Sequence, residues 1–258
     1  MQGFDIGNVL SKSFSCFARH WTRFVLLVAI VMLPVLIANL FLISSLQEIE
    51  QMQELDPNDQ QAAKEAMMFL LSFMGIMCGV IFLNICLQSL ATASLVYGTF
   101  KDMRGQPVII RECLGIALKR LPMLILLSFV VGIVVAFGAL FCCVPGIIAW
   151  VFFYLVIPAA VVENSGLGSF GRSIELVKGS FWPILAIGLI FVIGIGMIGS
   201  GVTSQIFALI DDRLGVIIGW LTGIFATTII GISQAVSYHD IRAAKEGLVD
   251  EDIAAIFD

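Results

Sequence analysis

Five long stretches of the chain contain no charged residue, and they are its clearest pattern. They run from Phe24 to Gln47, Ala66 to Phe100, Leu121 to Val162, Gly179 to Ile210 and Leu214 to His239. A charge at the centre of a bilayer costs at least about 2.5 kcal/mol. About 20 helical residues cross the hydrocarbon at a rise of about 1.5 Å per residue. Each stretch is long enough to cross, so the pattern predicts membrane-spanning helices.

The number of spans depends on where these stretches break. Val144, Pro145 and Gly146 interrupt the third stretch near its middle, which indicates a tight hairpin of two helices. The second stretch contains no proline, which favours one long or tilted helix. We therefore expect six spans, at about residues 23–46, 67–96, 122–142, 145–162, 183–206 and 214–237.

Amphipathic stretches precede the first, third and fifth spans, at about residues 4–21, 108–121 and 167–181. Apolar residues recur there at intervals of three and four, with basic residues on the opposite face, which is typical of helices lying at a membrane surface. The predicted fold is an all-α polytopic membrane protein built from three pseudo-repeats, each an interfacial helix followed by a two-span hairpin. The alternative is that any helix entering a span shows this pattern without duplication.

Composition and charge agree with this fold and orient it. The chain is 59% hydrophobic and 13% charged, with a mean hydropathy of +1.03. Of its 14 Lys and Arg residues, all but Lys64 and Arg213 fall on one side of the predicted spans. Positive residues concentrate in cytoplasmic segments, so we expect both termini in the cytoplasm, with a cytoplasmic tail at 238–258. The expected location is the bacterial inner membrane, and a nucleic-acid partner has no support.

Chemical motifs are absent from the sequence. It contains no nucleophile elbow, phosphate-binding loop or zinc-protease pattern, and its six cysteines lack metal-ligand spacing. Cys142 and Cys143 adjoin a predicted outer turn, but a disulfide between neighbours would be strained. We expect no catalytic residue, metal or cofactor, and hence a protein that is not an enzyme.

Small and polar residues mark two further features of the spans. Gly215, Gly219, Gly223 and Gly231 fall on one face of the last span at intervals of four or eight residues, like a glycine zipper. This face predicts close packing within the chain or, alternatively, self-association into a homo-oligomer. A second face, with Asn84, Gln88 and Thr92, predicts a polar seam or a small cavity against another helix.

Basic residues of the three interfacial stretches are candidates for contact with anionic lipid headgroups. They are Lys12, Arg19, Arg111, Lys119, Arg120, Arg172 and Lys178. The first functional hypothesis is therefore a non-enzymatic membrane protein that organises lipids or partner proteins. The alternative is a transporter or channel for a small or lipid-like substrate that uses the seam of Asn84 and Gln88.

Two segments of the second half carry a resemblance to a known family. RSIELVKGSFWPIL begins at Arg172, and SYHDIRAAKEGL runs from Ser237 to Leu248. The chain resembles the YciC-like bacterial inner-membrane family, and it is similar to the membrane domain of glycerophosphoryl diester phosphodiesterases. In those enzymes a separate soluble barrel carries the chemistry. The resemblance therefore implies a membrane domain and transfers no catalytic residue.

Overall fold

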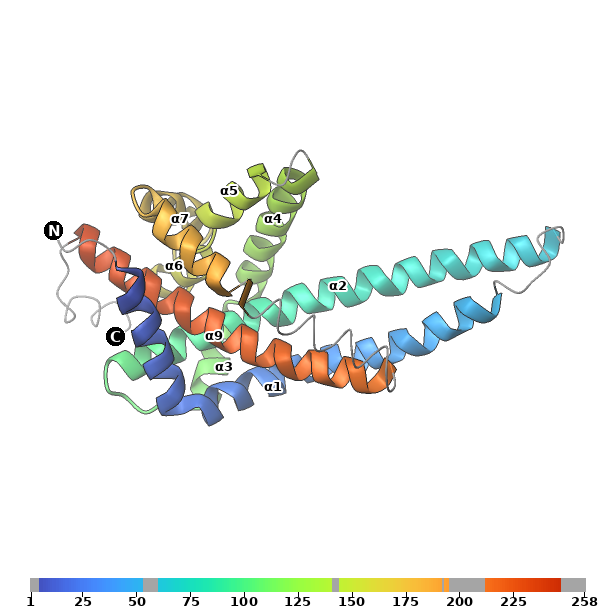
Figure 1. Ribbon diagram of the computed structural model, residues 1–258, viewed down its shortest axis with the longest axis horizontal. Coiled ribbons are helices and arrows are strands. Elements are labelled where there is room, and N and C mark those ends of the chain that lie inside the picture. The colour runs from blue at the N-terminus through green and yellow to red at the C-terminus, as the bar shows by residue number, and fades with distance from the viewer. Residues whose placement is uncertain (1–4, 53–59, 141–143, 192, 195–211, 247–258) are drawn as a thin grey trace.

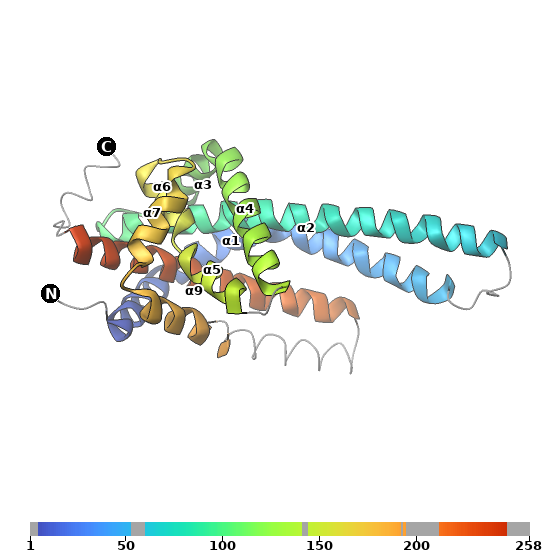
Figure 2. The same ribbon diagram turned by 90° about the horizontal axis from the view of Figure 1, so that it is seen from above.

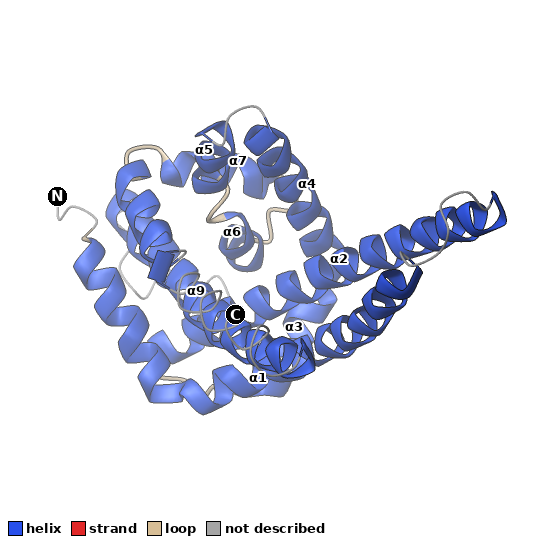
Figure 3. Cartoon of the chain, turned by 45° about the vertical axis from the view of Figure 1, so that its right-hand side comes forward, coloured by secondary structure: helices blue, strands red, loops and turns tan. Residues whose placement is uncertain are grey.

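The computed structural model describes residues 5–52, 60–140, 144–191, 193–194 and 212–246, and every regular element within them is a helix (Figure 3). The labelled helices, in chain order, are α1 Ile6–Met52, α2 Gln60–Met103, α3 Ile110–Lys119, α4 Leu121–Leu140, α5 Val144–Phe152, α6 Val156–Glu163, α7 Gly168–Val177 and α9 Asp212–Glu246. A further helical segment, Phe181–Phe191, follows α7.

Five helical segments are long and apolar enough to cross a membrane. They are Ile6–Ile43, Met67–Met103, Leu121–Leu140, Val144–Glu163 and Arg213–Glu246. A sixth span results if α7 and Phe181–Phe191 count as one, although the two meet at a bend of 99°. The chain is thus an all-helical protein with five or six candidate spans. Most of the predicted span at 183–206 lies outside the described residues.

The chain bends where each predicted interfacial stretch gives way to a span. In α1 the helical geometry breaks at His20, with φ −131° and ψ 25°. Arg120 separates α3 from α4, and Gly179, with φ +91°, follows α7 in a left-handed conformation that suits glycine. The threefold repetition of these units stays a prediction.

Helices α1, α2 and α9 pack along one another and form the centre of the core (Figures 1 and 2). Glycines allow their closest contacts. A Cβ atom added at Gly231 of α9 would lie 2.7 Å from Leu95 Cδ1, and one added at Gly98 of α2 would lie 2.9 Å from Phe24 Cε1. Glycine at these points lets the Leu95 and Phe24 side chains lie close to the neighbouring backbone, and a larger residue would require those side chains to shift.

Helix α2 is continuous, as the absence of proline led us to expect, but its two halves differ in burial. No residue between Met67 and Gln88 is buried, whereas every residue from Ser89 to Phe100 except Tyr97 is. The hairpin of α1 and α2 correspondingly extends beyond the other helices in Figures 1 and 2. Only the second half of α2 belongs to the core.

Helices α4 and α5 form a tight hairpin that meets backbone to backbone. A Cβ atom added at Gly138 would lie 2.8 Å from Gly146 Cα, and one added at Gly146 would lie 2.8 Å from Ala139 N. The predicted span at 145–162 consists of two short helices, α5 and α6. Pro158 explains the break, because it lacks the N–H that would continue the helix and is tolerated only in the first turn of α6.

Candidate functional site

Ion pairs gather at one end of the helix group, which we call the basic end and define by Lys12, Arg19, Lys101, Arg172 and Lys245. Lys12 Nζ lies 2.9 Å from Asp240 Oδ1, which joins α1 to α9. Asp102, at the end of α2, is 3.4 Å from Arg19 Nη1 and 2.9 Å from His20 Nε2.

The start of α1 and the end of α9 both lie at this end (Figure 1). Residues that the charge pattern assigned to one side of the membrane therefore contact one another across several helices.

A pocket of 470 Å³ opens among these charges, and we call it the basic-end pocket. Helix α1 contributes Ser11, Lys12, Ser15, Cys16 and Arg19, the end of α2 contributes Phe100 and Asp102 to Arg104, and α9 contributes Val236 and His239. Three cationic side chains and one carboxylate thus line a cavity that also presents two serine hydroxyls. Such a lining suits an anionic, oxygen-rich group.

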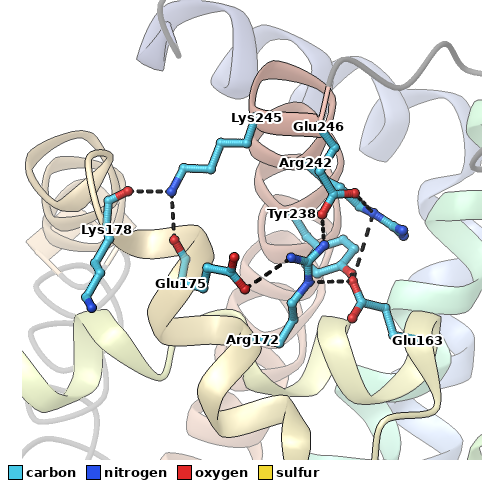
Figure 4. A network of polar contacts seen from close by, with 8 residues as sticks. All are labelled: Glu163, Arg172, Glu175, Lys178, Tyr238, Arg242, Lys245 and Glu246. Carbon is cyan, nitrogen blue, oxygen red and sulfur yellow. Dashed lines mark hydrogen bonds and ion pairs between the residues drawn. The ribbon is translucent and has the colours of Figure 1, made fainter.

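A second group of charges ties α6, α7 and α9 together through Glu163 (Figure 4). The Glu163 carboxylate lies 2.8 Å from Arg172 Nε and accepts a 2.6 Å hydrogen bond from the Tyr238 hydroxyl. Arg172 also pairs with Glu246 of α9, and Glu246 accepts a hydrogen bond from Arg242 Nε at 2.8 Å. We call this set the Glu163 network.

Two segments far apart in the sequence meet in the Glu163 network, because Arg172 belongs to one and Tyr238, Arg242 and Glu246 belong to the other. These residues lie on α7 and α9 respectively.

Two cations at the basic end satisfy the carbonyl groups that helix ends leave unpaired. Arg120 Nη1 donates to the carbonyl oxygens of Ala160, at 3.0 Å, and Val161 in the last turn of α6. Lys245 Nζ donates to the carbonyl of Glu175, at 2.7 Å, and to that of Lys178 at the end of α7 (Figure 4). Cations are favoured at helix C-termini for this reason.

The seven predicted headgroup residues fall into two groups. Four have partners within the fold: Lys12, Arg19, Arg120 and Arg172. The other three, Arg111, Lys119 and Lys178, are exposed and pair with no described carboxylate. In Figure 4 the Lys178 ammonium points away from the Glu163 network. Only Lys12 and Arg19 of the seven line the basic-end pocket, where Arg104 joins them.

The predicted polar seam borders a second cavity, of 360 Å³, which we call the amide cavity. Asn84 and Gln88 line it, but Thr92 does not, because it is buried in the core half of α2. Gly215, Gly219 and Gly223 of α9 line the same cavity. Gly231 lies farther along α9, against Leu95 of α2. The glycine face of α9 thus borders the amide cavity at Gly215, Gly219 and Gly223 and packs against α2 at Gly231.

Burial affects two ionisable groups near the interfacial helix α3. It raises the pKa of the Cys113 thiol to about 11, so this cysteine is protonated at neutral pH and a poor nucleophile. It also lowers the pKa of the Arg120 guanidinium from its usual value, although arginine stays charged in proteins. Among the described residues, no group of three His, Cys, Asp or Glu is placed to hold a metal ion.

The sequence pattern predicted the basic headgroup residues but not the carboxylates that pair with them. Asp102 is only 6% exposed, and it pairs with both Arg19 and His20. Asp240 pairs with Lys12. Asp240 directly follows the end of an uncharged stretch and Asp102 comes two residues after one, where a charged side chain reaches the membrane surface. That position could have identified both aspartates from the sequence, because an acid there can pair with the basic residues of neighbouring segments.

Comparisons with known proteins add no relative: no protein-family model, no curated protein and no solved structure matches the chain.

Proposed function

We propose that this chain is a non-enzymatic protein of the bacterial inner membrane that binds and organises anionic lipids through the basic-end pocket. In this proposal the basic end faces the cytoplasm, and the pocket receives the phosphate of a lipid headgroup. The non-enzymatic assignment rests on the absence of catalytic motifs from the sequence.

The location of the basic-end pocket is the observation that carries the proposal. Its lining comes from the points where three uncharged stretches meet charged sequence, just before Phe24, at and after Phe100, and at His239. A stretch free of charge ends where the hydrocarbon ends. In this proposal the pocket lies at the level of the lipid headgroups.

The chemistry of the pocket supports a phosphate as its occupant. Arg19 is 58% exposed and 3.4 Å from Asp102, so its guanidinium has N–H groups left to donate to a second oxygen anion. Arg104 and Lys12 border the same space, and the hydroxyl groups of Ser11 and Ser15 add donors. Charge-assisted hydrogen bonds to phosphate are among the stronger polar contacts, and basic segments are attracted to anionic leaflets.

Lipid retention measured by native mass spectrometry tests this proposal. The protein is released from detergent micelles that contain equal amounts of phosphatidylglycerol and phosphatidylcholine. We expect the wild type to retain phosphatidylglycerol, and the double variant Arg19→Gln, Arg104→Gln to bind it about tenfold more weakly. The matched control Arg111→Gln, Lys119→Gln removes the same charge outside the pocket and should bind like the wild type. Equal binding by the pocket variant, or equal loss in the control, overturns the proposal.

A transport role is the second candidate, and the amide cavity is the observation that favours it. A transporter must expose its binding site to each side of the membrane in turn. A single cysteine, Thr227→Cys, in a background without other cysteines would report this exposure. Modification by a charged thiol reagent both in spheroplasts and in inside-out vesicles supports transport, whereas protection on either side counts against it.

A further inference from the structure

The amide cavity lies within the predicted spans, at a depth that three helices define independently. Asn84 lies 16 residues before Phe100, Gly223 lies 16 residues before His239, and Asn39 lies 15 residues after Phe24. At about 1.5 Å per residue, all three are about 22–24 Å from the basic end. The hydrocarbon core is about 30 Å thick. The cavity therefore lies in the leaflet opposite the basic end, a few ångströms below its surface.

The hydrogen bonds around the cavity leave one amide without a partner. Asn39 Nδ2 donates to the Val35 carbonyl at 2.9 Å, and Gln88 Nε2 donates to Thr227 Oγ1 at 3.2 Å. Asn84 makes no hydrogen bond with a described residue, although it lines the cavity. An unpaired amide in hydrocarbon costs several kcal/mol. A ligand that supplies both a donor and an acceptor removes this cost, and a hydroxyl group supplies both.

The lining of the cavity selects for an uncharged ligand. Its described residues include no Asp, Glu, Lys or Arg, so among them a charged group in the cavity would find no counter-ion at membrane depth. The remaining walls are apolar, among them Val35 and Ile224. The site thus combines a few polar groups with a hydrophobic surface, as sites for amphiphilic ligands do.

Glycine and a fixed tryptophan shape the cavity and leave one side open. A Cβ atom added at Gly223 would meet nothing within 4 Å. Trp220 is held in place because its Nε1 donates to the Met32 carbonyl at 2.9 Å. Asn84, Gln88 and Gly223 are all exposed, and within a span the surroundings of an exposed residue are lipid. An acyl chain can therefore enter from the side.

We infer that the amide cavity binds an uncharged lipid whose hydroxyl group pairs with the Asn84 amide, with diacylglycerol as the representative ligand. Its hydroxyl replaces the missing partner of Asn84, and its acyl chains leave through the open side of the cavity into the adjacent hydrocarbon. This site shares no residue with the basic-end pocket. Each proposal can consequently fail without the other.

Binding of two related lipids tests the inference on the wild-type protein. Dioleoylglycerol is compared with its methyl ether, which keeps the acyl chains and loses the hydroxyl donor, by native mass spectrometry of the full chain. We expect the wild type to bind dioleoylglycerol about tenfold more tightly than the ether. Equal binding of the two lipids overturns the inference.

Variants locate the binding site. Gly223→Leu fills the cavity and should abolish binding, and Asn84→Leu should make the alcohol and the ether bind equally. Gly132→Leu is the matched control, because Gly132 of α4 is an exposed glycine at which an added Cβ atom would meet nothing within 4 Å, and it lies outside the cavity. It should behave like the wild type. Unchanged binding by Gly223→Leu, or preference for phosphatidylglycerol at this site, contradicts the inference.

Discussion

The Tyr238 hydroxyl donates a hydrogen bond of 2.6 Å to Glu163 Oε1 across 75 positions of the sequence. Glu163 is the last residue of α6, and Asn164 beyond it adopts a left-handed conformation that ends the helix. Arg172 approaches the same carboxylate from α7. One acidic side chain therefore fixes α6 and α7 against α9 at the basic end.

Replacing Glu163 should destabilise the fold more than replacing a neighbouring acid. Glu163→Gln removes one of the carboxylates that pair with the partly buried Arg172, which keeps Glu246, and weakens the bond from Tyr238. We expect a loss of about 1–3 kcal/mol, measured as a lower midpoint of thermal unfolding in detergent. Glu175→Gln is the control, since the Glu175 side chain is 71% exposed and 3.4 Å from Arg172. Equal midpoints for the two variants would show that the Glu163 network does not stabilise the fold.

The backbone contact between α4 and α5 predicts a contrast between two glycines of one helix. Gly138→Ala places a methyl group 2.8 Å from Gly146 Cα and should cost about 1–3 kcal/mol, because neither backbone can yield easily. Gly132→Ala has open space around it and should be neutral or stabilising. Thermal unfolding of both variants checks this. Equal midpoints of thermal unfolding for the two variants would mean that α4 and α5 do not meet backbone to backbone at Gly138.

Uncharged stretches predicted the helices well because charge is excluded from hydrocarbon by a large free energy. The break at Val144, Pro145 and Gly146 predicted the hairpin of α4 and α5, and the absence of proline agrees with the single helix α2. The contact of Gly138 with Gly146 was not predicted, because these glycines are eight residues apart on either side of a turn and form no periodic pattern on one helix. Pairing across a hairpin depends on the turn geometry, which hydropathy does not contain.

Predicting the site was harder because its residues act in pairs. The cations could be identified from their excess on one side, but Arg120 and Arg172 proved to be bound to partners in the fold. Their partners, a helix end and Glu163, become neighbours only when α6 packs beside α4 and α7. Asn84 and Gln88 could be identified because both fall on one helix at a fixed spacing.

The orientation in the membrane predicts which positions are accessible from outside the cell. We expect Lys64→Cys, in a background without other cysteines, to react with a membrane-impermeant maleimide in intact spheroplasts. Lys178→Cys should react only after the membrane is opened, because it belongs to the basic end. Both positions are exposed in the fold, so packing does not limit the reaction. The reverse pattern would place the basic end outside the cell. It would then be unable to bind lipids of the cytoplasmic leaflet.

Photo-crosslinking tests the lipid-binding account most directly. The wild-type protein is reconstituted with phosphatidylglycerol that carries a diazirine on its headgroup, irradiated, and mapped by peptide mass spectrometry. We predict that adducts concentrate in two of the three segments that line the basic-end pocket, Ser11 to Arg19 and Phe100 to Arg104. Adducts spread evenly over Arg111, Lys119 and Lys178 would contradict the account, because they would mean that exposed charge alone attracts the lipid.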